Sequence, residues 1–459
     1  MSVHVVILAA GQGSRMKSNL PKVLHPLAGK SLLHHVVENS DTLGAEGTHI
    51  VIGHGAELVR ESFENIETSN TIHWSKQEQQ LGTGHAVAQA LPNVPDDVTV
   101  LILYGDVPLT NTTTLSALLS HVSEKSIALL TVNLNDPSSY GRIVRDSSGF
   151  VQAIVEHKDA TPQQLAINEI NTGILAAPAS KLKEWLPKLS NSNAQGEYYL
   201  TDIIAMAVSD KMEVAVANPA CEEEVQGVNN RIQLATLERW YQAREAERLM
   251  TEGATLIDPA RLDVRGNVTI GKDVFIDVNV VFEGDVELAE GVLVGPNCII
   301  KNSKIGENTT INANSIVEDS VVGQSANIGP FARLRPGTQL ANNTKVGNFV
   351  ETKKAIVGEG SKINHLSYVG DAVLGTNVNV GAGTITCNYD GVNKFKTEID
   401  DDVFVGSNSS LVAPVRIGKK ATIGAGSTVT KEVDADQLAV ARGKQRNMDN
   451  WQRPVKNNL

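Results

Sequence analysis

Hydrophobic residues recur at every sixth position through the second half of the chain. The pattern runs from residue 264 to residue 429 and shifts by one position at a few points. An α-helix repeats every 3.6 residues, whereas the side chains of a strand alternate with a period of two, so a six-residue period indicates short strands. The repeat residues are Val264, Ile270, Ile276, Phe282, Leu288, Val294, Ile300, Ile305, Ile311, Val317, Val322, Ile328, Leu334, Leu340, Val346, Val357, Ile363, Val369, Leu374, Val380, Val405, Leu411, Ile417, Ile423 and Val429.

This repeat predicts a parallel β-helix, a solenoid in which stacked coils share one narrow apolar core. Small or β-branched residues often lie four positions after a repeat residue, as at Val274, Cys298 and Ser315, and we expect them at the corners of that core. Glycine often follows the repeat residue directly, as at Gly271 and Gly295. We expect these glycines to provide turns with positive φ.

The first half of the chain alternates apolar runs with helical stretches. Such alternation favours a mostly parallel, Rossmann-like α/β sheet with right-handed crossovers, which binds ligands at the carboxyl ends of its strands. The predicted strands are Val3–Ala10, His49–Ile52, Val98–Tyr104 and Ile127–Asn133, and the predicted helices include Ser31–Asn39 and Thr83–Ala90.

A segment rich in helix formers separates the two halves. Residues 230–252 carry scattered apolar positions among charged ones and are predicted to form one connecting helix. We therefore expect an α/β domain at 1–229, this helix at 230–252, the β-helix at 253–436 and a polar tail at 437–459.

Composition excludes several classes of partner. The net charge of -12 and the aromatic content of 4% argue against nucleic-acid binding. Cys221, Cys298 and Cys387 form neither a disulfide framework nor a CxxC metal pattern. Without a long apolar run or a signal-like start, we expect a cytoplasmic protein with no membrane partner.

A glycine-rich turn follows the first predicted strand. Gly11 and Gly13 let the backbone approach a ligand, and Arg15 and Lys22 add positive charges suited to phosphate. The turn matches neither GxGxxG nor the Walker pattern, so a tight turn with a surface arginine is the alternative. Asp106, after another strand, suits a metal ligand or a turn carboxylate.

Charged residues interrupt the solenoid repeat around residues 333–398. Arg333, Arg335, Lys353 and Lys354 form a basic cluster that can hold phosphates, and residues 384–398 insert about a dozen residues without the repeat. His365 is a candidate general base, and the alternative is a histidine packed on a coil corner.

Several motifs carry a family resemblance. The segment LAAGQGSRMKSNLPKVL, residues 8–24, resembles the signature of sugar-phosphate nucleotidylyltransferases. Together with the hexapeptide repeat, the whole chain resembles the bifunctional bacterial enzymes that make UDP-N-acetylglucosamine for peptidoglycan and lipopolysaccharide, whose β-helix is left-handed. Further motifs agree in order and spacing: Gln77, Leu81–Gly84, Tyr104–Asp106, Tyr140–Arg142, Val155–Glu156, Asn171–Gly173 and Gly227–Asn229.

For the first half, this resemblance implies transfer of UMP from UTP to N-acetylglucosamine 1-phosphate, with release of pyrophosphate. It implies Mg²⁺, replaceable by Mn²⁺, bound by Asp106 and Asn229. The backbone of Ala10 and Gly11 with Gln77, Gly82 and Thr83 would contact uridine, Lys22 would bind phosphate, and Gly141, Glu156 and Asn171 would contact the sugar. The wider nucleotide site would include Leu8, Ala9, Arg15, Tyr104 and Gly105.

For the second half, the resemblance implies acetylation of glucosamine 1-phosphate by acetyl-CoA in a homotrimer. His365 would deprotonate the amine. The sugar phosphate would be bound by Arg335, Lys353, Tyr368, Asn379 and Lys394. Acetyl-CoA would be contacted, or the reacting groups oriented, by Ala382, Asn388, Tyr389, Ser407, Ala425 and Arg442, of which Arg442 follows the family pattern most loosely.

Two other functions stay open at this point. One is a nucleotidylyltransferase whose solenoid has only a structural role, although the charges at Arg335, Lys353 and His365 argue against it. The other is a sugar-nucleotide sensor that binds without turnover, for which the sequence offers no specific feature.

Overall fold

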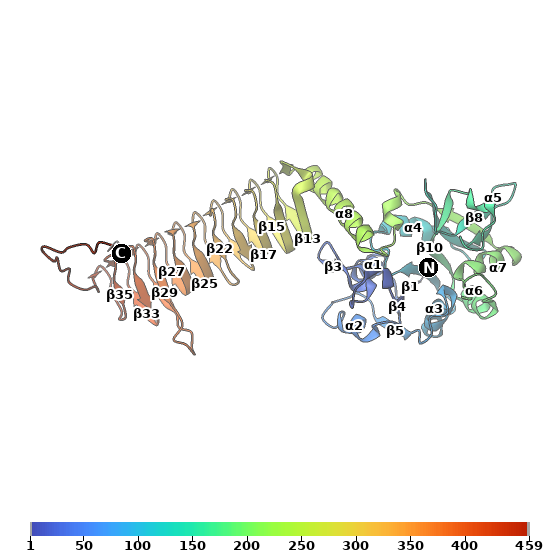
Figure 1. Cartoon of the computed structure of the whole chain (residues 1–459), viewed down its shortest axis with the longest axis horizontal. Coiled ribbons are helices and arrows are strands. Elements are labelled where there is room, and N and C mark those ends of the chain that lie inside the picture. The colour runs from blue at the N-terminus through green and yellow to red at the C-terminus, as the bar shows by residue number, and fades with distance from the viewer. Residues whose placement is uncertain (1, 457–459) are drawn as a thin grey trace. The chain divides into compact units, whose positions relative to one another are not determined.

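The computed structural model describes residues 2–456 and divides into two compact units, one ending at Tyr241 and the other beginning at Gln242 (Figure 1). Helix α8 (Arg231–Thr251) contains this division and covers most of the predicted connecting segment. None of the helices among the described residues is long and apolar enough to cross a membrane.

The N-terminal unit is built on one mixed sheet in the order β11-β7-β10-β6-β1-β4-β5. All neighbours on this path are parallel except β10, which runs antiparallel to β6 and β7. The hairpin β8–β9 extends from β10, and β2 (Pro26–Leu27) pairs with β3 (Lys30–Ser31). The sheet strands are β1 (Val3–Ala9), β4 (Gly47–Ile52), β5 (Ile72–Lys76), β6 (Thr99–Tyr104), β7 (Ser126–Asn133), β8 (Arg142–Arg145), β9 (Val151–Val155), β10 (Glu169–Pro178) and β11 (Glu213–Ala217).

Helices cover both faces of this sheet, because neighbouring residues of a buried strand point to opposite sides. Val6 and Leu8 of β1 pack in a core with α3, α6 and α7, while Val5 and Ile7 pack in a second core with α1, α2 and α4. Ser31 caps α1 by accepting the His34 amide at 3.1 Å. The helices are α1 (Leu32–Thr42), α2 (Ala56–Glu61), α3 (Thr83–Ala90), α4 (Thr112–Ser120), α5 (Pro162–Leu165), α6 (Ala179–Trp185) and α7 (Ile203–Ser209).

The C-terminal unit is a β-helix of stacked coils with three strand-bearing faces. Leu293 pairs with Thr310 and Asn327 pairs with Lys345, so one coil takes 17 or 18 residues, or three six-residue repeats. The hydrophobic pattern shifts by one position wherever a coil has 17 residues instead of 18. The first face consists of β12 (Thr255–Leu256), β14 (Phe275–Ile276), β16 (Leu293–Val294), β18 (Thr310–Ile311), β21 (Asn327–Ile328), β24 (Lys345–Asn348), β26 (Lys362–His365), β28 (Asn379–Val380), β31 (Phe404–Val405), β34 (Thr422–Ile423) and β36 (Leu438–Ala439).

A second, larger sheet covers the other two faces. Long strands such as β13 span both faces, and in other coils two short strands share them. Its members are β13 (Leu262–Ile270), β15 (Val280–Leu288), β17 (Ile299–Ile305), β19 (Ile316–Glu318), β20 (Val321–Val322), β22 (Arg333–Leu334), β23 (Gln339–Leu340), β25 (Glu351–Val357), β27 (Tyr368–Leu374), β29 (Ile385–Cys387), β30 (Thr397–Ile399), β32 (Ser410–Val412), β33 (Val415–Ile417) and β35 (Thr428–Val429).

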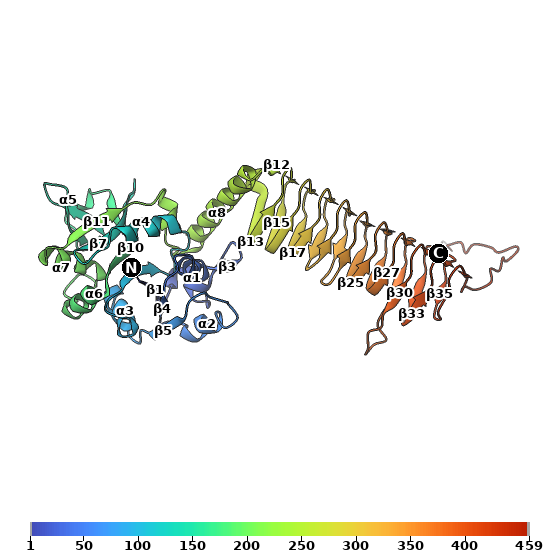
Figure 2. The same ribbon diagram turned by 180° about the vertical axis from the view of Figure 1, so that it is seen from behind.

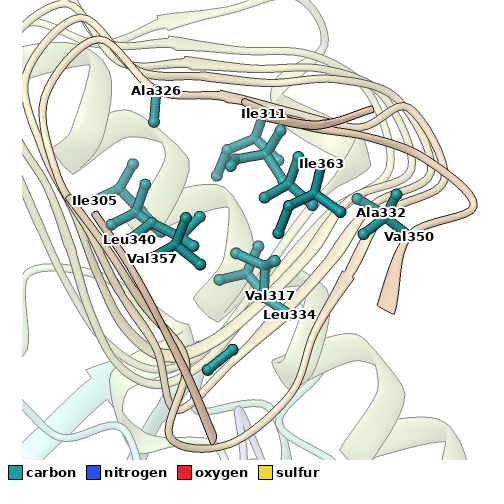
Figure 3. Packing of buried hydrophobic residues seen from close by; sticks show 14 of the residues in the cluster. Ile305, Ile311, Val317, Ala326, Ala332, Leu334, Leu340, Val350, Val357 and Ile363 are labelled. Atoms are coloured by element: carbon teal, nitrogen blue, oxygen red, sulfur yellow. The ribbon is translucent and has the colours of Figure 1, made fainter. Parts of the chain in front are cut away.

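The repeat residues form the predicted core of the coils (Figure 3). All are buried except Ile270, which is partly buried against them. Two interruptions of the pattern are occupied by threonines, Thr352 and Thr386, which are buried as well. The Thr352 and Thr338 hydroxyls are hydrogen-bonded at 3.0 Å, and Thr386 Oγ1 accepts the Gly370 amide at 2.8 Å. A polar residue therefore continues the repeat where its hydroxyl has a partner.

The expectation for the repeat glycines was wrong. Among these glycines Gly329 has positive φ, but Gly271, Gly347 and the others do not. A Cβ at Gly271 would lie 2.5 Å from the Glu290 amide nitrogen, and one at Gly347 would lie 2.0 Å from the Asn364 carbonyl oxygen. Glycine is needed here because the next coil passes too close for a side chain.

Positive φ instead occurs three positions after the repeat residues of the first face. We call this series the corner ladder: Asn279, Asn297, Asn314, Phe331, Phe349, Leu366, Gly383, Asn408 and Gly426. The residues directly before it form a second series, which we call the site column: Val278, Pro296, Ala313, Pro330, Asn348, His365, Ala382, Ser407 and Ala425. Most amides of the corner ladder donate to carbonyls of the site column one coil earlier, as Leu366 does to Asn348 at 3.1 Å, whereas the Phe349 amide donates to the Phe331 carbonyl at 3.0 Å.

Candidate active sites

A pocket of about 230 Å³ lies where the loops after β1, β5 and β6 meet. These strands present their carboxyl ends at one edge of the sheet, the usual ligand position in open α/β folds. Most residues that line this pocket belong to the predicted nucleotide site. The exceptions are Val23, Gln80, Ala86 and Glu197. The pocket is lined by Leu8, Ala9, Ala10, Gly11, Lys22, Val23, Gln77, Gln80, Gly82, Thr83, Ala86, Tyr104, Asp106 and Glu197.

The glycine-rich turn lies at one end of this pocket. Within the described part of the chain, the amides of Gly11, Gln12 and Gly13 donate to no backbone carbonyl, so they are open to an anion. Gly13 has a φ of 62°, and a Cβ there would lie 2.6 Å from Lys22 Cβ. The turn therefore needs glycine both for its conformation and for the close passage of Lys22.

Lys22 joins the two residues predicted to bind the metal. Its ammonium group donates to Asp106 Oδ2 and, at 3.2 Å, to Asn229 Oδ1. The Asn229 oxygen also accepts from Arg15 Nη2 at 2.9 Å, although Arg15 does not line the pocket. The Val228 amide donates to the Asp106 carbonyl at 2.8 Å, which holds the distant Asn229 beside Asp106.

The donor atoms at this point fit a hard divalent cation. Carboxylate and amide oxygens, here of Asp106 and Asn229, are ligands that Mg²⁺ accepts, and Mg²⁺ usually completes its shell with water and substrate phosphates. In residues 2–456 no group of three or more His, Cys, Asp or Glu side chains could hold a metal ion. Two protein oxygens therefore suit a metal that arrives with a phosphate-bearing substrate.

The residues predicted for the sugar form a neighbouring cluster: Gly141 directly precedes β8, Glu156 directly follows β9, and Asn171 lies in β10. The Asn171 amide donates to the Gly141 carbonyl at 2.9 Å, and a Cβ on Gly141 would lie 3.4 Å from Glu156 Oε1. Burial raises the pKa of the Glu156 carboxyl, which accepts from Thr201 Oγ1 at 3.1 Å. Burial likewise raises the pKa of the Tyr104 phenol. Gly105 anchors the strand end, its amide donating to the Leu8 carbonyl at 2.9 Å.

Sequence reasoning missed Gln80 and Glu197. Gln80 Nε2 donates to the Ala10 carbonyl at 2.6 Å, so it connects the turn after β5 to the turn after β1. Gln77 Nε2 donates to the Gly82 carbonyl at 3.1 Å and shapes the same turn. The position of Gln80 between the motif residues Gln77 and Gly82 could have identified it. No sequence signal marks Glu197.

The second candidate site begins with the predicted basic cluster of the solenoid. Arg335 Nη1 donates to Glu351 Oε1 at 2.7 Å, and this bond raises the pKa of the arginine. The nearby charges of Lys394 and then Arg335 lower the pKa of Lys353. Tyr368 is the register partner of Glu351, and its hydroxyl lies over Gly370. Arg335, Lys353 and Lys394 thus lie on one side of the solenoid. Their positive charge exceeds the negative charge of the carboxylates beside them.

The insertion is shorter than predicted. β29 and β30 keep their places in the ladder, so only residues 388–396 leave the coil, near β30 (Figure 2). Tyr389 and Lys394 form an isolated antiparallel bridge, and Asp390 Oδ1 accepts the amides of Val392 and Asn393 at 2.8 and 2.6 Å. Asn388 is buried and donates to Asp371. The loop is therefore a short hairpin that carries Lys394.

His365 belongs to the site column together with three of the residues predicted for acetyl-CoA. Ala382, Ser407 and Ala425 continue this column, and Arg442 Nη1 donates to the Ala425 carbonyl at 2.8 Å. Asn379 is not in this column. It pairs with Lys362 and Phe404 on the first face, whereas Arg335 and Lys353 follow the corner on the next face.

Comparisons with known proteins match three family models to separate parts of the chain. Residues 5–189 match the MobA-like NTP transferase domain, residues 264–348 the GMPPB C-terminal domain, and residues 396–431 the bacterial transferase hexapeptide (six repeats).

Three curated relatives are each named "Bifunctional protein GlmU". The relative from Marinobacter nauticus is 66% identical over 454 residues, the one from Cellvibrio japonicus 60% over 454, and the one from Pseudomonas putida (strain GB-1) 58% over 456. Each alignment covers 99% of this chain and 99% of the relative. The chain therefore belongs to the bifunctional GlmU family.

Proposed function

We propose that the solenoid acetylates glucosamine 1-phosphate with acetyl-CoA and that the N-terminal unit then joins the product to UTP, giving UDP-N-acetylglucosamine and pyrophosphate. The observation that carries this proposal is the presence of two separate sites, a phosphate-type pocket at a sheet edge and a basic, histidine-bearing corner on the solenoid. The three cysteines are free, which is compatible with a reducing cytoplasm.

In the N-terminal unit, transfer needs positioning and charge more than a covalent nucleophile. A sugar-phosphate oxygen attacks the α-phosphorus of UTP, and pyrophosphate leaves with the bond electrons. The open amides of Gly11 to Gly13 and the cations of Arg15 and Lys22 would hold the phosphate oxygens, on which negative charge accumulates. The Glu156 and Asn171 cluster would hold the sugar.

We propose Mg²⁺ as the metal of this site, held by Asp106 and Asn229. When bound, it would neutralise phosphate charge and align the reacting groups. Lys22 currently donates to the same two oxygens, so its ammonium group would move toward the phosphates.

In the solenoid, the amine of glucosamine 1-phosphate attacks the thioester carbonyl of acetyl-CoA. A C–N bond forms and the C–S bond breaks, while Nε2 of His365 takes the amine proton, which finally protonates the departing thiolate. Arg335, Lys353 and Lys394 would bind the phosphate. Ala382, Ser407 and Ala425 are small, and Arg442 beside them offers a cation for the phosphates of coenzyme A.

We further propose that copies of the chain assemble as a homotrimer through the apolar part of the corner ladder. Phe331, Phe349 and Leu366 are 49%, 56% and 63% exposed, and the two rings stack with centroids 5.3 Å apart. The corresponding corners of earlier coils carry asparagines instead. An apolar stack beside His365 is covered if neighbouring copies meet at this corner, which would also bring residues of separate faces into one site.

Replacing Phe349 with Asn tests the assembly without disturbing the corner, because asparagine tolerates positive φ and occupies this ladder at Asn314. We expect the mass in analytical ultracentrifugation to fall from that of a trimer toward that of one chain. An unchanged trimer would move the interface elsewhere, and a monomeric parent protein would contradict the assembly altogether.

A double dissociation tests the two activities. Asp106→Ala is expected to reduce pyrophosphate release by at least about 10³-fold and to leave thiol release unchanged. His365→Ala is expected to reduce thiol release by about 10²- to 10⁴-fold and to leave pyrophosphate release unchanged.

Thiol release that survives His365→Ala would remove the histidine from the mechanism. If the parent chain releases thiol at no detectable rate, the solenoid is a scaffold, and the single-activity alternative is correct. If it binds the substrates without releasing either product, the chain is a sensor.

A further inference from the structure

The site column consists of apolar or small residues in every coil except two neighbouring ones. These two coils carry Asn348 and His365. Before this pair come Val278, Pro296, Ala313 and Pro330, and after it comes Ala382. Asn348 and His365 pair in register on β24 and β26. An asparagine therefore stands directly beside the only histidine of the second unit.

The two side chains are joined by a short hydrogen bond. Nδ1 of His365 lies 2.6 Å from Oδ1 of Asn348. An amide oxygen can only accept, so the imidazole proton is on Nδ1 and the lone pair is on Nε2. His365 is exposed and Asn348 is half-buried, so the ring is held from the coil side while Nε2 is free to face a substrate.

The backbone of His365 is restrained as well. Ser367 Oγ donates to the His365 carbonyl at 2.9 Å, and the Leu366 amide donates to the Asn348 carbonyl at 3.1 Å. Ring and main chain are thus both tied to the coil below. The imidazole can still turn about its two side-chain torsions, and the bond to Asn348 restrains both.

We propose that Asn348 is a positioning residue for acetyl transfer, which selects the Nδ1–H tautomer of His365 and aims Nε2 at the substrate amine. This inference rests on the proposed role of His365 as the general base. Asn348 itself does not receive the proton. A partner that orients a reacting imidazole typically contributes about 10- to 100-fold.

Two variants and one control test the proposal in the full-length chain. Asn348→Ala removes the acceptor, and kcat for thiol release is expected to fall about 10- to 100-fold with little change in KM. Asn348→Asp keeps the acceptor but adds a negative charge that stabilises the imidazolium. We expect the acid limb of its pH–rate profile to move to higher pH, with activity recovered on the alkaline side. Asn327→Ala, which removes a solenoid asparagine bonded to Asn312 at 3.1 Å, should leave thiol release unchanged.

A double-mutant cycle distinguishes the positioning role of Asn348 from the general-base role of His365. If Asn348 acts only through His365, Asn348→Ala has no further effect in a His365→Ala background. An equal loss in both backgrounds, or an unmoved acid limb in Asn348→Asp, overturns the positioning role while the general base stands. Full activity of His365→Ala would instead overturn the proposed function of His365 and Asn348 together. Pyrophosphate release and thermal unfolding, measured on each variant, show that the chain is folded.

Discussion

The two units of this protein assemble their sites over different distances along the chain. In the N-terminal unit, Lys22 meets residues 84 and 207 positions away. In the solenoid, Asn348 and His365 are 17 positions apart, one coil, and Arg335 and Glu351 are 16 apart. A solenoid residue contacts the coil above and the coil below, whereas the neighbouring strands of a sheet can come from distant parts of the sequence, as β1 and β6 do. Residues that meet in the solenoid site can thus be found by counting one coil length along the sequence. Residues that meet in the sheet site cannot be found in this way.

The largest expected difference concerns how damage spreads. Phe282→Ala empties a fully buried position of the solenoid and should cost about 3–5 kcal/mol. Because coils contact only their neighbours, we expect hydrogen exchange to accelerate about 100-fold or more in β13, β15 and β17 and to stay unchanged in β32. Leu101→Ala in β6 should instead accelerate exchange in β1, β4 and β6 together. Equal acceleration of β15 and β32 in Phe282→Ala would contradict the one-dimensional behaviour.

A slightly smaller effect concerns a buried carboxylate that has no counterpart in the solenoid. Glu224 is fully buried and accepts from Asn111 Nδ2 at 2.7 Å and from Thr114 Oγ1 at 2.8 Å at the start of α4. Glu224→Ala leaves these donors without the acceptor and should lower unfolding stability by about 3 kcal/mol. Urea unfolding followed by Trp74, Trp185 and Trp240 fluorescence measures it. The control Glu222→Ala removes an exposed acid of the same run and should have less than about 0.5 kcal/mol of effect.

The next effect is a dependence on pH confined to the N-terminal unit. His49 lies between His4 and His73, with ring centroids 5.2 and 4.8 Å away, and burial lowers its pKa to about 4. The unfolded chain therefore binds more protons between pH 6.5 and 4, so stability falls as pH falls through this window. At pH 4.5 the loss should be about 2 to 3 kcal/mol relative to pH 7.5.

His49→Gln removes this titration and should flatten the fluorescence-monitored stability between pH 7.5 and 4.5. His121→Gln, at an exposed histidine, should keep the slope of the parent protein. A parent-like slope in His49→Gln would assign the acid sensitivity to other groups, of which His4, whose pKa burial also lowers, is the first to examine.

The smallest effect compares two glycines. Gly347→Ala places a Cβ 2.0 Å from the neighbouring coil and should destabilise the solenoid by about 1–3 kcal/mol. Gly11 has nothing within 4 Å of an added Cβ, so Gly11→Ala should leave stability within about 0.5 kcal/mol and raise the KM for UTP in the pocket it lines. Thermal scans followed by circular dichroism distinguish the two, and an unaffected solenoid in Gly347→Ala would contradict the close-packing explanation of the repeat glycines.

The sequence predicted best those features that depend on residues close together along the chain. The helix at Thr83–Ala90 and the inward repeat of the solenoid follow from periodicity within one turn or one coil. The family motifs named most residues that line the pocket at the sheet edge. The pattern failed at Thr352 and Thr386, where a hydroxyl with a coil-to-coil partner replaces an aliphatic side chain, and at the repeat glycines, where the reason is the next coil and not φ.

By itself, then, the sequence determined which residues face the solenoid core, where four strands and two helices of the first unit lie, and which motifs carry the family resemblance. Tertiary structure alone decided that the Lys22 ammonium group bridges Asp106 and Asn229, that Glu224 is buried with Asn111 and Thr114 as its donors, and that Asn348 holds His365. The reason is physical. Burial patterns repeat over a few residues because side chains alternate along one strand or helix, whereas hydrogen bonds between distant residues depend on where the chain returns.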